Sequence, residues 1–388
     1  MRGTILHFTT ELGRRTVGGV GTCLNELRRA SGPGVGFVLL GERDDDPPMP
    51  NVVQAGYYDM DVLNRLDFDA AVFHHYGLAY LVDDSFLRGR PLVYVVHSVP
   101  TTEPWSLLDP YGGHDDVARA FERLLDAASR IVCLSRAERG KLLTLYPDLH
   151  SKTFLLPAGF SALEAMPLAL RPERSVFGFL GRADERKGIR ELVRAFADAP
   201  GARLRIACGD EDPDYAAAVR DDIARLGLEG RIEWVGRVGE ADKLSFLRSL
   251  DALVAPSRWE PFGYVALEAL RAGVPPLVGR QGGLVEIVGS SYPYVFDPTR
   301  VESIAGCIAA FRRDDAADVR RAFAAARRRT ASWTAERMAA AFEAFLREPP
   351  LAPPASAAPA RRYAGNGELR APAAFAHASA TPRRGPFR

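Results

Sequence analysis

The feature that most constrains the fold of this sequence is a repeated alternation of short apolar runs and helical patterns. In the first half the strand-like runs are Thr4–Thr9, Val35–Leu40, Ala70–His74, Leu92–His97 and Ile131–Leu134, and helical patterns occupy Thr22–Ala30, Asp115–Ala128 and Arg136–Leu145. Because parallel strands need a crossover connection, usually a helix, this alternation predicts a parallel, doubly wound α/β sheet.

A second series of the same kind begins at Val176. Its strand-like runs are Val176–Leu180, Arg203–Cys208, Arg231–Val235, Ala252–Ala255 and Pro276–Val278, and its helical patterns are Ile189–Ala199, Tyr215–Leu226 and Ala241–Leu250. The chain has 388 residues, more than one hydrophobic core usually holds. We therefore expect two Rossmann-like domains in series.

The composition changes at three places that we interpret as boundaries. We expect an N-terminal domain at residues 1–165 and a C-terminal domain at 172–330, because Leu, Ala, Pro and charged residues crowd the segment between them. The amphipathic pattern from Trp333 to Leu346 predicts a last helix, placed at 331–348. Residues 349–388 are rich in Pro, Ala and Arg, which predicts a disordered tail.

Charge, hydropathy and cysteine content indicate which partners and which compartment to expect. The net charge of +1 indicates neither a nucleic-acid nor a membrane partner, and no apolar run reaches the ~18 residues of a transmembrane helix. The first residues lack the pattern of a signal peptide. The four cysteines are scattered, which favours buried thiols in a reducing, cytoplasmic compartment. Only four of 50 basic residues are lysines, a bias that suggests a high-GC bacterial genome.

Polar residues and glycines stand where strands of the first domain end. Ligands of doubly wound folds bind beyond the carboxyl ends of the strands. A glycine-rich loop containing Gly19 and Gly21 links the first strand to a helix, where backbone N–H groups can approach an anion. His74 and His97 end two further strands. A flexible connection and two structural histidines are the alternative interpretations.

The second domain places a pair of cations after its first strand. Arg182 and Lys187 are five residues apart, and the run from Glu185 to Gly188 opens a helix. A guanidinium binds phosphate oxygens bidentately, an ammonium acts as a point charge, and a helix N-terminus adds partial positive charge. The pair therefore predicts a diphosphate site, with a solvated turn as the alternative.

Two glutamates frame the apolar segment that follows Ala252–Ala255. Glu260 is expected in the loop after that strand, and Glu268 about two turns into the next helix. Carboxylates accept hydrogen bonds from the vicinal hydroxyls of a sugar or ribose. Gly263, between them, leaves backbone N–H groups open to the same ligand. Two solvated glutamates beside a helix remain the alternative.

These motifs together resemble one family. The run Glu260–Glu268 resembles the E-x7-E signature of retaining nucleotide-sugar glycosyltransferases with the GT-B fold (glycosyl transferases group 1). Gly273-Val274-Pro275 resembles the family's G-x-P. The stretch from Gly282 to Val288 resembles its G-G-x-x-E-I-V, and Gly181-Arg182 with Lys187-Gly188 its G-R…K-G. The resemblance is dense from about Val176 to Ala344 and sparser before it.

The resemblance implies a role for each candidate residue. Arg182 and Lys187 would neutralise the donor diphosphate, and Glu268 would hold the ribose hydroxyls. Glu260, with the backbone of Phe262 and Gly263, would contact the transferred sugar. The N-terminal domain would add Gly19 and Gly21 near the phosphates and His97 near the sugar, and the helix that includes Trp333 would cross back to that domain.

The implied reaction is metal-independent transfer of a hexosyl-type sugar to a hydroxyl acceptor, with retention of configuration and no cofactor beyond the nucleotide sugar. Stabilisation of the departing diphosphate by Arg182 and Lys187 would supply most of the catalysis. The rivals are a metal-dependent transferase using D-x-D pairs such as Asp59/Asp61, Asp67/Asp69 or Asp210/Asp212, a glycosidase using Glu260 and Glu268, and an inactive sugar-nucleotide-binding partner subunit. The donor, the acceptor and the oligomeric state stay open.

Overall fold

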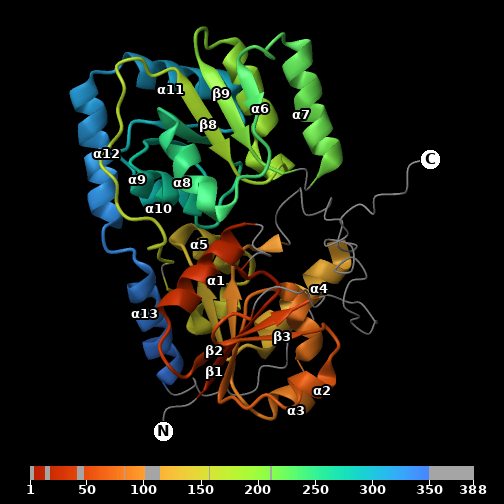
Figure 1. Cartoon of the computed structure of the whole chain (residues 1–388). Helices are drawn as coiled ribbons and strands as arrows, with labels where there is room; N and C mark the ends of the chain where they lie inside the picture. The colour runs from red at the N-terminus through yellow and green to blue at the C-terminus, as the bar shows by residue number, and fades with distance from the viewer. Residues whose placement is uncertain are drawn as a thin grey trace.

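A computed structural model of the chain describes residues 4–13, 18–41, 48–82, 84–100, 114–156, 158–209 and 212–348. The tail predicted at 349–388 lies outside the described residues. Two parallel-sheet α/β domains stand one above the other (Figure 1), which confirms the expected fold class.

The first sheet has the strand order β3-β2-β1-β4-β5-β6-β7 within the described residues, and every pairing in it is parallel. Its strands are β1 (Ile5–Thr9), β2 (Val35–Leu40), β3 (Val52–Ala55), β4 (Ala70–Phe73), β5 (Leu92–Val96), β6 (Arg130–Cys133) and β7 (Thr153–Leu155). The connecting helices are α1 (Gly19–Ala30), α2 (Met60–Leu63), α3 (Asp84–Leu87), α4 (His114–Ala127) and α5 (Arg136–Leu145), with the 3-10 helices η2 (Tyr76–Leu81) and η5 (Pro147–Lys152).

The second sheet has the order β10-β9-β8-β11-β12-β13 in the part of the chain that the structure describes. Its strands are β8 (Val176–Leu180), β9 (Arg203–Ala207), β10 (Ile232–Trp234), β11 (Ala252–Ala255), β12 (Pro276–Gly279) and β13 (Val295–Phe296). Its helices are the 3-10 helix η6 (Glu185–Lys187) and α6 (Ile189–Ala197), α7 (Pro213–Arg225), α8 (Glu240–Arg248), α9 (Tyr264–Ala272), α10 (Leu284–Val288), α11 (Val301–Arg313) and α12 (Ala316–Thr330).

Strand alternation gives the first sheet two packed faces. Leu6 and Phe8 of β1 belong to one core, and Ile5 of the same strand belongs to the other. The core that contains Ile5 also contains Leu24 of α1 and Phe342 of the last helix. Successive side chains of a strand point to opposite faces of the sheet, so alternate residues of β1 pack against the helices on opposite sides.

The last helix, α13 (Ala335–Arg347), belongs spatially to the first domain. It descends from α12 and runs beside α1 (Figure 1). It begins two residues later than the predicted start at Trp333, because Thr334 caps it by accepting from the N–H of Arg337 at 3.3 Å. Trp333 stays with the second domain, its ring 5.8 Å from that of Phe262.

Other differences from the sequence prediction concern short edge elements. The strands β3, β7 and β13 have two to four residues each and were not predicted from the sequence. Helix α1 begins at Gly19, inside the glycine-rich loop, and not at Thr22. The boundaries at residues 165 and 172 stay predictions.

Candidate active site

Arg182 and Lys187 lie beyond the carboxyl end of β8, as predicted. The guanidinium of Arg182 is 3.2 Å from the carboxylate of Asp184, and its side chain is 39% exposed. Lys187 ends η6, and Gly188 then caps α6. A Cβ on Gly188 would lie 2.4 Å from the carbonyl oxygen of Pro256, so glycine permits this loop to pack against the loop after β11. That close approach places Lys187 beside the loop that carries Glu260.

Lys187 and Glu260 form an ion pair in which Nζ is 2.6 Å from Oε2, and each side chain is only 14% exposed. The hydroxyl of Ser257 donates to the same oxygen at 3.1 Å. Burial raises the pKa of the Glu260 carboxyl, but the charges of Lys187 and Arg186 outweigh it, so the pKa lies below its ordinary value. Glu260 is therefore an ionised acceptor at neutral pH.

The loop from Glu260 to Gly263 rests on the glycine pair at the start of the next motif. A Cβ on Gly282 would lie 2.1 Å from the carbonyl oxygen of Glu260, and the N–H of Gly283 donates to that same oxygen at 2.7 Å. Phe262 is buried and Gly263 caps α9. The glycine pair thus fixes the backbone that presents Glu260, while backbone contacts from Phe262 and Gly263 to a sugar stay a prediction.

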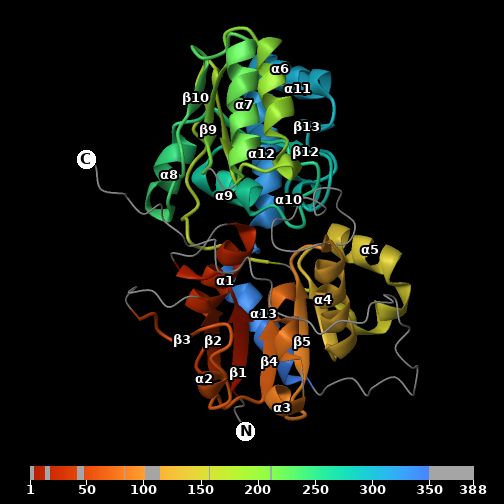
Figure 2. The ribbon, with the colours of Figure 1, turned by 90° about the vertical axis from the view of Figure 1, so that its right-hand side faces the viewer.

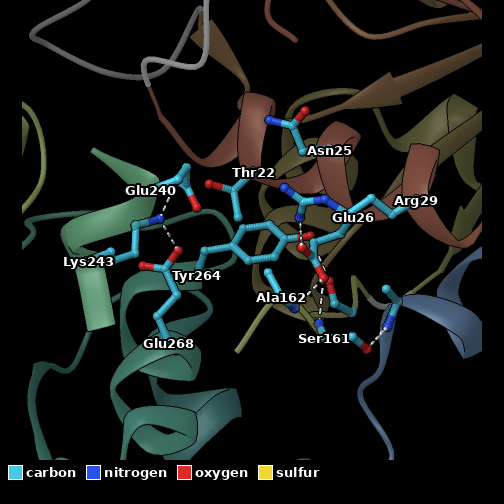
Figure 3. A network of polar contacts seen from close by, with 12 residues as sticks. Thr22, Asn25, Glu26, Arg29, Ser161, Ala162, Glu240, Lys243, Tyr264 and Glu268 are labelled. Atoms are coloured by element: carbon cyan, nitrogen blue, oxygen red, sulfur yellow. Dashed lines mark hydrogen bonds and ion pairs between the residues drawn. The ribbon is translucent and has the colours of Figure 1, made fainter. Parts of the chain in front are cut away.

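Glu268 lies one turn into α9, not two, and is buried. Its Oε1 is 2.8 Å from Nζ of Lys243, which also pairs with Glu240 at 2.6 Å (Figure 3). Burial lowers the pKa of Lys243, but the two carboxylates outweigh it and raise the pKa above its ordinary value. Burial raises the pKa of Glu268, and Lys243 offsets this only in part. Sequence reasoning gave Lys243 no role, although its rarity as a lysine was a usable signal.

The two predicted glycines lie in the first turn of α1, which meets the start of α9 (Figure 3). A Cβ on Gly19 would lie 3.6 Å from the ring of Tyr264, the first residue of α9. The N–H of Gly21 donates to the carboxylate of Glu11 at 3.2 Å. A role for Gly19 and Gly21 near a phosphate therefore stays a prediction, and the amide of Gly21 already has an acceptor within its own domain.

Glu26, on the same helix, ties α1 to the segment between the domains. Its Oε2 accepts from the backbone N–H groups of Ser161 and Ala162, and its Oε1 lies 2.7 Å from Arg29 (Figure 3). Glu26 is only 2% exposed, and burial raises its pKa. The sequence did not identify this contact, since its partners lie more than a hundred residues away.

His97 follows β5 and takes part in a row of imidazoles. Its Nε2 is 3.0 Å from Nδ1 of His74, and Nε2 of His74 is 2.8 Å from Nδ1 of His7. His7 and His74 are buried and His97 is partly exposed. Of the three, only His97 was a predicted site residue.

Helix α5 lies at the edge of the first domain that faces the second (Figure 2), and its first turn is hydrogen-bonded to the second domain. The carboxylate of Glu286 accepts from the first two backbone N–H groups of α5, at 3.1 and 2.7 Å, a favourable position for an anion. The Ser135 hydroxyl donates to the carbonyl of Pro261. Trp259 donates from Nε1 to Glu138 at 2.8 Å. The loop that carries Glu260 is therefore held by hydrogen bonds to the first domain.

Three aspartates of the D-x-D pairs, Asp59, Asp69 and Asp212, take part in local structure. Asp59 caps α2, and Asp212 caps α7 by accepting from the N–H of Tyr215 at 3.0 Å. Asp69 accepts from the N–H of Thr4 at 2.6 Å. Asp210 lies outside the described residues. Within the described ranges, no group of three or more His, Cys, Asp or Glu side chains is arranged to hold a metal ion.

None of the helices that the structure describes in residues 4–348 is both long enough and apolar enough to cross a bilayer.

Comparison with known proteins identifies the domain that carries most of these residues. Residues 151–330 match the family model described as glycosyl transferases group 1. Curated relatives include D-inositol 3-phosphate glycosyltransferases of Mycobacterium marinum, 26% identical over 252 residues, and of Mycobacterium tuberculosis, 27% identical over 254 residues. Each alignment covers 60% of this chain, and the chain spans about half the length of these relatives, 50% and 49%.

Solved structures share the fold over nearly the whole described chain. Sucrose-phosphate synthase from Thermosynechococcus elongatus superposes with a TM-score of 0.74 and 19% identity, covering 89% of this chain and 98% of that one. HepE of Anabaena in complex with UDP and glucose gives 0.70 and 18%, covering 89% and 99%. Residues 151–330 therefore match the glycosyl transferases group 1 family, and the described chain shares the two-domain GT-B fold of these solved structures.

Proposed function

We propose that this protein is a retaining, metal-independent glycosyltransferase, which moves a hexosyl-type sugar from a nucleotide diphosphate sugar to a hydroxyl acceptor of a bacterial glycan, glycoconjugate or natural product. It needs no cofactor in this proposal. The observation that carries it is the grouping of two cations and a carboxylate, Arg182, Lys187 and Glu260, at the carboxyl edge of the second sheet, with Lys187 and Glu260 in contact.

The two cations match the charge that develops in the reaction. When a nucleotide diphosphate leaves the anomeric carbon, negative charge grows on its β-phosphate oxygens. Preorganised positive groups stabilise that charge, and this is usually the largest single contribution to catalysis. Lys187 is held in place by Glu260, whose carboxylate also accepts from Ser257, so the ammonium is positioned before a ligand binds. Arg182 is more exposed and can bind the diphosphate bidentately.

The two carboxylates have different environments and different proposed partners. Glu260 is an ionised acceptor beside Lys187 and would orient the hydroxyls of the transferred sugar. Glu268 contacts Lys243 through Oε1, and we assign its Oε2 to the ribose hydroxyls. Neither is the nucleophile in this proposal, and His97 would contact the sugar from the first domain.

The relatives' names support the reaction class and leave the substrates to experiment. The mycobacterial relatives are named for transfer to an inositol phosphate, and HepE is described in complex with UDP-glucose. We therefore place UDP-glucose first among candidate donors and polyol hydroxyls first among acceptors. A cytoplasmic location is also proposed, because the four cysteines are all free and buried.

A donor screen followed by product analysis tests the proposal. Nucleotide sugars are screened for a rise in the unfolding midpoint, since a ligand bound only by the folded state stabilises it. Transfer from the best donor is then measured with and without excess EDTA, and the anomeric configuration of the product is read by proton NMR. Retention with activity unchanged in EDTA supports the proposal. An inverted product, loss of transfer in EDTA, or hydrolysis of aryl glycosides without a nucleotide sugar contradicts it.

A further inference from the structure

Three histidines line up diagonally across the first sheet. Strand pairing sets His7 opposite Val72 and Phe73 opposite Tyr94. His74 therefore lies two residues beyond the partner of His7, and His97 lies two residues beyond the position opposite His74. Steps of two residues keep all three imidazoles on one face of the sheet. The row rises from within β1 to the carboxyl edge, where such folds bind their ligands.

Direct hydrogen bonds join the three rings. Nδ1 of His7 is 2.8 Å from Nε2 of His74, and Nδ1 of His74 is 3.0 Å from Nε2 of His97. Burial lowers the pKa of His7 and of His97 to about 3, and burial with the neighbouring imidazoles lowers that of His74. The three rings are therefore neutral near pH 7, and each has one N–H donor and one acceptor nitrogen.

The tautomers of neutral rings in such a row are coupled by their hydrogen bonds. Each contact needs one N–H and one lone pair, so all protons lie on Nδ1 or all lie on Nε2. The inner end of the row decides between these two arrangements. The ring of His7 stacks on Phe37 at 5.0 Å and meets the edge of Phe342 at 6.2 Å. A proton on Nε2 of His7 would leave an unsatisfied N–H in this apolar setting, which a buried donor rarely tolerates.

We propose that His7 and His74 are positioning residues that fix His97 as the Nδ1-protonated tautomer, so that His97 presents an N–H donor to a sugar hydroxyl. His7 donates to His74, His74 donates to Nε2 of His97, and the remaining proton of the row lies on Nδ1 of His97. The contact of His97 with the sugar rests on the proposed function above. The tautomer and its dependence on His7 and His74 do not, since they concern hydrogen bonds within the first domain.

Nitrogen NMR on the full chain labelled with ¹⁵N-histidine tests the row directly. The protonated and unprotonated nitrogens of a neutral imidazole have well separated shifts, and His97 is assigned by loss of its signals in His97→Ala. In the wild type we expect a single Nδ1-protonated form of His97. His74→Phe removes both contacts of the row, and His7→Phe lets His74 carry its proton on either nitrogen. In both variants we expect His97 to become a mixture of tautomers.

A conservative variant separates positioning from mere packing. In His74→Asn the amide nitrogen can stand near the place of Nδ1 and donate to His97, so the Nδ1-protonated form should persist. The kcat of His74→Phe should fall about tenfold or more, the size of effect known for the loss of groups that orient metal-ligating histidines, while His74→Asn keeps more of the wild-type kcat. His150→Phe, a change at an exposed histidine outside the row, should alter neither quantity.

Each outcome bears on one hypothesis. An unchanged tautomer of His97 in folded His74→Phe and His7→Phe overturns the positioning role, as does an Nε2-protonated His97 in the wild type. If His74→Phe does not fold, His7→Phe and His74→Asn decide by the same spectra. If His97→Ala keeps wild-type turnover, the sugar contact of the proposed function fails, and the nitrogen shifts still judge the row.

Discussion

The two domains bring opposite kinds of polar chemistry to the carboxyl edges of their sheets. The second domain contributes full charges in close pairs, Lys187 with Glu260 and Lys243 with Glu268. The first domain contributes neutral imidazoles in a row that ends at His97. In the proposed reaction, the cations of the second domain would bind the diphosphate and its carboxylates the hydroxyls of the sugar and the ribose, whereas the first domain would contact the sugar through the neutral ring of His97.

The lysines sharpen this contrast, because arginine outnumbers lysine so strongly in this chain. Lys187 pairs with the partly buried Glu260 and Lys243 with the buried Glu268. Lys152 donates to carbonyls at the end of α4, and Lys141 lies 4.7 Å above the ring of Trp259. Every lysine thus makes a specific contact. A compact ammonium fits these positions where a broad, planar guanidinium does not.

The largest effect expected on the charged side is on stability. Lys243→Met removes the cation from buried Glu268 and should lower the free energy of unfolding by about 3 kcal/mol, as when one partner of a buried ion pair is deleted. Urea denaturation measures it. The double variant Lys243→Met/Glu268→Met should regain most of the stability while donor affinity remains lost. Equal stability of both variants would show that the pair is not coupled.

The next effect concerns turnover. Arg182→Ala should reduce kcat with saturating donor by about 100-fold or more, because it removes charge stabilisation at the leaving diphosphate. Glu268→Ala should mainly weaken donor binding. Arg321→Ala, which changes an exposed arginine paired with Asp318 on α12, is the matched control and should behave as wild type. A wild-type rate in Arg182→Ala would remove this residue from the site.

The neutral side predicts a pH dependence of stability. The pKa of His7 is lowered to about 3, so between about pH 6.5 and pH 3 the unfolded state binds a proton that the folded state excludes. The contribution of neutral His7 to the free energy of unfolding is complete above about pH 6.5. As pH falls below that value, the contribution is lost at up to about 1.4 kcal/mol per pH unit.

Urea unfolding of wild type and His7→Phe at pH 6 and pH 5 measures that slope, which should be shallower in the variant. His150→Phe should keep the wild-type slope. A variant slope identical to the wild-type one would mean that His7 is not held neutral.

The smallest expected effect is a loss of stability at the contact between the second domain and the first. Trp259→Phe deletes the hydrogen bond from Nε1 to Glu138 and should cost about 1 kcal/mol, with a partial compensation from the retained ring. Thermal unfolding measures the loss, and donor affinity should fall only a few-fold. A loss as large as that of Lys243→Met would mean that the domain contact dominates the stability of the site.

The charged side could be anticipated from local sequence, whereas the neutral side could not. Arg182, Lys187 and Glu260 stand in loops directly after strands, so the parallel topology already brings them to one edge. The sequence did not indicate the roles of Lys243 and Glu26, because their partners Glu268 and Ala162 lie 25 and more than a hundred residues away. His7 was hidden in the middle of a strand, where nothing local distinguishes it from an apolar neighbour.

The sequence by itself determined the α/β class, the two sheets and the positions of most strands along the chain, because alternating periodicity is a local property of the chain. Only the tertiary structure decided which glutamate pairs with which lysine, that α13 returns to α1, and that His7, His74 and His97 are in contact. The physical reason is that the register between neighbouring strands and the contact between distant helices depend on packing across the whole molecule. A shift of one residue in β4 against β1 would turn His74 to the other face and break the row.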